Sequence, residues 1–117
     1  MMLFDYGNTL LVSSVCVHEL IHLVQIGKVQ KVENGKRKVI APETIVAGIE
    51  DAGMEMASVG KQHLSVLAAL PLYDDHRDPN DRLIIAQAMA DRIPLVSSDR
   101  KFARYVRHGL DFIFNER

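Results

Sequence analysis

Two aspartates, Asp81 and Asp99, occupy positions at which α/β proteins often carry their chemistry. Both lie in one block, residues 76–105, with the sequence HRDPNDRLIIAQAMADRIPLVSSDRKFARY. Asp81 falls in the first turn of a predicted helix, and Asp99 follows a short apolar strand. In a layered α/β fold these two positions can meet at one edge of the sheet, where such folds bind their ligands. Two carboxylates that meet there indicate a divalent metal site and hydrolysis of a phosphate ester.

Glu19 is a third candidate ligand, because its predicted helix position makes a free carboxylate costly. His18, His22 and Gln25 form a separate polar stripe on this helix, whereas Glu19 points from its apolar face. The apolar side chains around it are Val15, Cys16, Leu20, Leu23 and Ile26. A carboxylate in such surroundings needs a neutralising partner, and a metal ion would be one. The alternative interpretation is that Glu19 only favours the positive N-terminus of its helix.

The two aspartates also have structural interpretations. Asp78 is expected to cap the helix predicted over residues 80–92, and Asp81 could complete a capping box with it. Asp99 could likewise cap the helix that follows it. The helix behind Asp81 is apolar almost all round, which predicts that it is buried and that function lies at its exposed end.

Strands and helices that must position these acids alternate along the chain, which predicts an α/β fold with a mainly parallel sheet. Asn34-Gly35, between two short alternating arms, indicates a type I′ hairpin. Ser14 is expected to cap the first helix. The predicted strands cover residues 9–13, 54–59, 94–98 and 111–114, and the predicted helices cover residues 15–26, 42–52, 61–70, 80–92 and 100–107.

Length and composition predict one ordinary globular domain. The chain has 117 residues, of which 48% are hydrophobic and 25% are charged. A net charge of −1 excludes a global field that attracts nucleic acid or membrane, so such contacts would need local basic patches such as residues 36–38. The single cysteine, Cys16, excludes an internal disulfide and fits a reducing cytoplasm. No apolar run is long enough to cross a bilayer, and no signal-peptide pattern is present.

The block over residues 76–105 resembles the C-terminal half of PIN-domain ribonucleases, specifically the VapC-type toxins of toxin–antitoxin pairs. The segment LLVSSVCVHELIHLVQIGKV, residues 10–29, resembles the second strand and the following helix of the same domains. The resemblance therefore extends from residue 10 to the C-terminus. Its most specific part is the string DPNDR…AQA…LVSSD…F.

The resemblance implies a PIN-like, flavodoxin-like three-layer sandwich that cleaves RNA with Mg²⁺ or Mn²⁺. By position it implies that Glu19, Asp81 and Asp99 are the catalytic metal ligands. The implied mechanism is attack of a metal-activated water in line on a phosphodiester, with the metal also stabilising charge on the phosphate. It further implies a VapB-like antitoxin partner and a homodimer in the cytoplasm.

The N-terminus departs from the family pattern. The family begins with an apolar strand ending in a metal-binding aspartate, and a whole helix follows before the strand matched here. This chain has eight residues before Thr9, and MMLFDYGN resembles the end of that helix. We therefore expect a chain shortened relative to the family, with its first strand missing and its sheet left open or completed by strand exchange with another chain. Asp5 is a poor substitute for the missing acid, which leaves open the alternative of a non-catalytic module that only binds an antitoxin.

Two other motifs suggest different chemistry. His18-Glu19-Leu20-Ile21-His22 matches HExxH, the zinc-protease pattern in which two histidines bind Zn²⁺ and the glutamate is the general base. The seventeen residues before it hardly supply the sheet that such enzymes need. Residues 4–11, FDYGNTLL, resemble the DxDxT loop of haloacid-dehalogenase-like phosphatases, but glycine stands at the position of the second aspartate.

Overall fold

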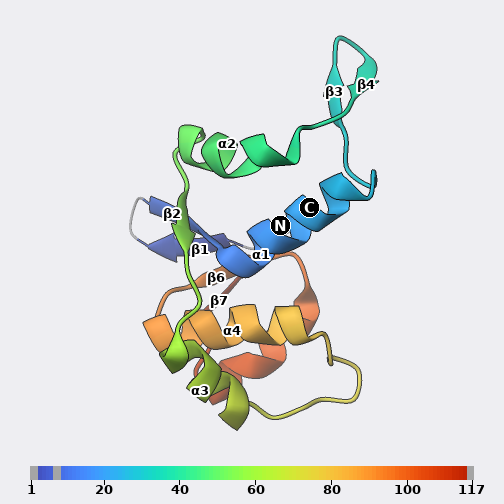
Figure 1. Ribbon diagram of the computed structural model, residues 1–117. Coiled ribbons are helices and arrows are strands. Elements are labelled where there is room, and N and C mark those ends of the chain that lie inside the picture. The colour runs from blue at the N-terminus through green and yellow to red at the C-terminus, as the bar shows by residue number, and fades with distance from the viewer. Residues whose placement is uncertain (1–2, 7–8, 116–117) are drawn as a thin grey trace.

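A five-stranded sheet forms the centre of the computed structural model, which describes residues 3–6 and 9–115 (Figure 1). Its strand order is β5-β2-β1-β6-β7. Four of the strands run in one direction, because β2 pairs with β5 in parallel, β6 pairs with β7 in parallel, and β1 is antiparallel to both β2 and β6. The strands are β1 (Leu3–Tyr6), β2 (Thr9–Ser13), β5 (Glu55–Ala57), β6 (Leu95–Ser97) and β7 (Phe112–Phe114). The prediction of an α/β fold with a mainly parallel sheet is confirmed.

The position of β1 corrects the interpretation of the N-terminus. MMLFDYGN was expected to end a helix, but Leu3–Tyr6 is a strand. It pairs with β2 through Phe4↔Leu11 and with β6 through Phe4↔Leu95. The side chain of Phe4 is 1% exposed, so burial in the apolar core holds β1 in place. β1 of this chain thus occupies the central position of the sheet, which the sequence had predicted to be empty or filled by a strand from another chain.

Helices cover both faces of the sheet, as the sandwich prediction requires. One core contains Phe4, Leu95 and the buried face of α4 (Pro79–Asp91), with α3 (Lys61–Ala69) and the 3₁₀ helix η2 (Arg100–His108) packed against it. The second core joins Val12 of β2 to α1 (Ser14–Gln25) and α2 (Ile45–Asp51), and the short 3₁₀ turn η1 (Pro42–Thr44) precedes α2. Neighbouring residues of one strand, such as Leu11 and Val12, contribute to different cores because successive side chains point to opposite faces.

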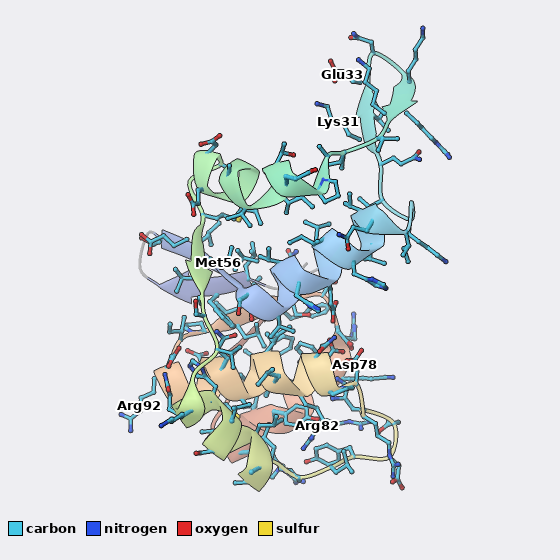
Figure 2. All side chains as sticks on the ribbon, in the orientation of Figure 1. Lys31, Glu33, Met56, Asp78, Arg82 and Arg92 are labelled. Atoms are coloured by element: carbon cyan, nitrogen blue, oxygen red, sulfur yellow. The ribbon has the colours of Figure 1, made fainter. Side chains whose placement is uncertain are left out.

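The predicted hairpin is confirmed as β3 (Lys31–Glu33) and β4 (Lys36–Lys38), which lie outside the central sheet. Asn34 and Gly35 have φ angles of 52° and 75°, the positive pair that a type I′ turn requires. The hairpin projects away from the rest of the protein, with Glu33 near its tip and Lys31 nearer its base (Figure 1 and Figure 2). Within the described residues, no helix is long and apolar enough to span a membrane.

Most helix boundaries differ from the predicted ones by one residue, but α2 begins three residues late because residues 42–44 form the 3₁₀ turn η1. The cap of α1 is Ser13 rather than Ser14, because the Ser13 hydroxyl accepts a hydrogen bond from the Val15 N–H at 3.1 Å. Asp78 caps α4 as expected, by accepting from the Asn80 N–H at 2.9 Å. Asp99 caps η2 in the same way, by accepting from the Lys101 N–H at 2.9 Å. The structural interpretations of Asp78 and Asp99 are therefore both correct.

Candidate metal centre

Asp81 and Asp99 come together at the edge of the sheet where the parallel strands end. Asp81 lies in the first turn of α4, and Asp99 follows β6 directly. One oxygen of each carboxylate and one ring nitrogen of His76 lie within 4.8 Å of one another. Figure 2 labels the neighbouring Asp78 at the start of α4. The edge that carries these acids is the one at which α/β folds bind ligands.

Glu19 reaches the same edge because α1 and α4 lie against each other and run in opposite directions (Figure 1). The helices are joined at one point by Ser13, whose hydroxyl donates to Oε1 of Gln87 at 2.6 Å. Glu19 lies six residues after Ser13, and Asp81 lies six residues before Gln87. Each step is about 9 Å along a helix axis, so the two residues lie at similar heights on neighbouring helices. The charge of Glu19 raises the pKa of Asp81, although Glu19 is not part of the 4.8 Å cluster.

Gln87 is a positioning residue that the sequence did not single out. Its side chain is fully buried and bridges two strands, because its amide nitrogen also donates to the carbonyl oxygen of Ala57 at 2.9 Å. Because both the oxygen and the nitrogen of its side-chain amide are hydrogen-bonded, Gln87 fixes the position of α4 along the ends of β2 and β5. The signal in the sequence that could have identified it is a single polar residue, Gln87, within the apolar run of α4.

Asp81 has an unusual protonation equilibrium. Burial, followed by the negative charges of Asp78, Glu19 and Asp99, raises its pKa to about 6. The carboxyl group thus resists ionisation in the absence of a compensating charge. Among the described residues, no lysine or arginine lies within ion-pair distance of Asp81 or Asp99.

The cations that the sequence places near these acids are engaged elsewhere. Arg104 forms a two-pronged contact with Asp75, and Arg77 pairs with Asp74 at 3.0 Å. Arg82 donates to the carbonyl oxygens of Leu70 and Pro71 at 3.0 and 3.3 Å. These three guanidinium groups are therefore bonded to groups other than Asp81 and Asp99.

His76 is the second functional candidate that the sequence did not single out as a ligand. It is 5% exposed, and its Nε2 atom lies 3.6 Å from Oδ2 of Asp81. Burial lowers its pKa, against the opposing effect of Asp99, which favours the neutral form of the ring. It lies in a polar segment before α4, and only the packing of that segment against Phe102 and Tyr105 of η2 reveals its burial.

The chemistry of this donor set fits a divalent cation. Carboxylate oxygens and imidazole nitrogens are common metal ligands, and a cation would offset both the burial and the neighbouring negative charges that raise the pKa of Asp81. It would also give a partner to Nε2 of His76, which is buried without a hydrogen bond.

The competing motifs are not assembled into sites in the described part of the chain. His18 and His22 are both exposed on α1, and no third histidine, cysteine or acid groups with them. The backbone of Asp5 pairs with Leu10, toward the opposite end of β2 from Ser13. The backbone of Asp5 thus lies toward the other edge of the sheet, because β1 runs antiparallel to its neighbours, and Gly7 and Asn8 of the DxDxT-like loop lie outside the described residues.

Comparisons with known proteins agree with this architecture. A family model described as the PIN domain matches residues 3–107. Among solved structures, the chain is similar to one in the crystal structure of VapBC2 from Rickettsia felis bound to a DNA fragment from their promoter. That similarity has a TM-score of 0.61 and 19% sequence identity, and it covers 92% of this chain and 76% of the other, which shows a common fold. No curated protein matches the chain significantly.

Proposed function

Because the chain belongs to the PIN-domain family, we propose that it is a VapC-type toxin that hydrolyses RNA phosphodiester bonds with Mg²⁺ or Mn²⁺. The observation that carries this proposal is the meeting of Asp81 and Asp99 at the sheet edge without a cationic side chain. Asp81 and Asp99 would hold the ion directly, and Glu19 would complete the acidic set from α1. A bound divalent ion would activate water and neutralise charge on the phosphate.

The residues around the acids support a phosphodiester substrate. Arg100 and Lys101 directly follow Asp99, and both are exposed. Lysine and arginine beside a nuclease site position the sugar–phosphate backbone without reading its bases. We therefore assign these two residues to contacts with the sugar–phosphate backbone of the RNA. Such a local basic patch is compatible with the net charge of −1 of the whole chain.

The proposed partner is a VapB-like antitoxin in the cytoplasm. A hollow of about 500 Å³ lies between α1 and α2, where an apolar segment of a partner could bind. Its apolar lining is formed by Leu20, Val39, Ile40, Ile45, Ile49 and Met54. The VapBC2 structure with a similar fold supports this assignment. The family resemblance supports a homodimer as well, and β1 makes strand exchange unnecessary for completing the sheet.

Cleavage of RNA by purified single-site variants tests the proposal. We expect Asp81→Asn and Asp99→Asn each to reduce Mg²⁺- or Mn²⁺-dependent cleavage by more than the roughly 10–100-fold that loss of an outer-shell partner costs. Asp74→Asn is the matched control, since the Asp74 side chain is 98% exposed and forms an ion pair with Arg77. Full cleavage by both site variants would contradict the assignment.

The same assay separates the enzyme from the binding-only alternative. A non-catalytic module would bind antitoxin with the wild-type sequence but would cleave no RNA with any divalent ion. An enzyme would cleave RNA when free and would lose activity when antitoxin is added.

A further inference from the structure

His76 has a buried ring nitrogen without a hydrogen-bond partner in the described part of the chain. Its Nε2 atom is buried, has no hydrogen-bond partner among the described residues, and faces the carboxylates of Asp81 and Asp99. Leaving a polar atom buried and unpaired costs about 1–3 kcal/mol. Such an atom in a native structure calls for a ligand or a special role.

The ring is held in this orientation by its other contacts. Its Nδ1 atom lies 2.7 Å from the hydroxyl oxygen of Tyr105, which is itself fully buried. The imidazole also packs edge-on against Phe102, with ring centroids 5.3 Å apart. Nε2 therefore cannot turn to solvent without breaking a buried hydrogen bond and an aromatic contact.

The distance from Nε2 to Asp81 suits a shared ion better than a direct contact. At 3.6 Å, the Nε2 to Oδ2 separation is too long for a hydrogen bond. Two ligands of one ion, each about 2.1 Å from it, lie at most about 4.2 Å apart. The 3.6 Å between Nε2 of His76 and Oδ2 of Asp81 is within that limit.

We propose that Nε2 of His76 is a direct metal ligand beside Asp81 and Asp99, and that it makes the site prefer Mn²⁺ to Mg²⁺. This inference rests on the metal site of the proposed function, but not on RNA cleavage. An imidazole nitrogen binds first-row transition ions well, whereas Mg²⁺ prefers oxygen ligands. The histidine would give the site a nitrogen donor beside the two carboxylates.

The proposal assigns the tautomer of His76 and a role to Tyr105. Ligation through Nε2 requires the proton on Nδ1, which then donates to the Tyr105 hydroxyl oxygen. Histidine ligands are commonly oriented by such a bond on their second nitrogen. Tyr105 is thus a positioning residue, which acts on the ion through His76.

Calorimetric titration of the full chain with MnCl₂ and with MgCl₂ tests the preference. We expect His76→Leu to weaken Mn²⁺ binding by more than about tenfold and Mg²⁺ binding much less, so that the ratio of the two affinities collapses. Tyr105→Phe should weaken Mn²⁺ binding by roughly tenfold or more through the lost orientation. His18→Leu, on the exposed face of α1, should change neither affinity.

Pulsed EPR of the Mn²⁺-loaded protein gives a direct readout. The wild type and His18→Leu should show coupling of the ion to a histidine nitrogen, and His76→Leu should not. His76→Gln, which keeps a polar side chain, serves in its place if the leucine variant does not fold. Mn²⁺ binding without nitrogen coupling would overturn the His76 assignment alone. Absence of any Mn²⁺ or Mg²⁺ binding by the wild type would overturn the metal site and the proposed function together.

Discussion

At the scale of single residues, Asp81 shows how a binding site is built at the expense of stability. Burial and three neighbouring acids raise its pKa to about 6, above the value of 3.8 expected for a free aspartate. A group whose pKa is raised in the folded state binds protons more tightly there than in the unfolded chain. Its contribution to stability is therefore largest at low pH and is lost as the pH rises from about 4 to about 6.

Asp81→Asn should consequently stabilise the metal-free protein at neutral pH. In EDTA, the gain in free energy of unfolding over wild type should grow between pH 4 and pH 6 and reach up to about 3 kcal/mol at pH 7. Urea denaturation at several pH values measures this difference. Asp74→Asn, at an exposed position, should show no such growth. A difference for Asp81→Asn that is independent of pH would contradict the raised pKa.

At the scale of elements, α4 places the site because both of its ends and its centre are anchored. Asp78 and Pro79 begin the helix, Gln87 bonds to Ser13 and Ala57, and Arg92 ends it in the left-handed conformation with φ 55°. Since Asp81 is only three residues from the cap, its position depends on where the helix begins.

Substitution of the cap tests this dependence. Asp78→Ala should lower the free energy of unfolding by about 1 kcal/mol relative to Asp78→Ser, because serine can still accept the N–H bonds that aspartate accepts. Both variants remove the same charge from the neighbourhood of Asp81, so the comparison isolates the cap. Thermal or urea denaturation of the pair measures it, and equal stabilities would show that the cap does not hold this helix end.

At the scale of the whole molecule, β1 joins the two halves of the sheet. It lies between β2 and β6, which belong to separate parallel pairs. Phe4 contributes to the core that also contains Leu95 and α4, and Leu3 packs against the other core. Without this strand the two halves would share no backbone hydrogen bonds within the described sheet.

Phe4→Ala should therefore cost about 3–5 kcal/mol of folding stability, as expected for a large buried aromatic side chain. Leu10→Ala is the matched control, because Leu10 lies in the adjacent strand but is 43% exposed, and it should cost less than about 1 kcal/mol. Urea denaturation of the two variants measures the difference. Similar small losses for both would mean that β1 does not occupy the centre of the sheet.

The local sequence was sufficient for every strand of the central sheet except β1, for the helices and for two of the acids. Apolar runs, Pro79, Asp78 and Asn34-Gly35 act within a few residues, so strands, helix starts and the hairpin turn follow from them with small boundary errors. The alternation of those elements then brings Asp81 and Asp99 to one edge, because consecutive parallel strands end on the same side.

Only the tertiary structure decided the direction of β1 and the surroundings of His76. Three or four apolar residues can form a strand or the end of a helix, and long-range pairing with β2 and β6 settles which. That pairing also carries Asp5 toward the opposite edge from the acids. His76 lies in a polar segment, and its burial depends on Phe102 and Tyr105, some thirty residues away, packing over it. Contacts between distant residues leave no local pattern, which is why the histidine facing the two aspartates emerged from the fold.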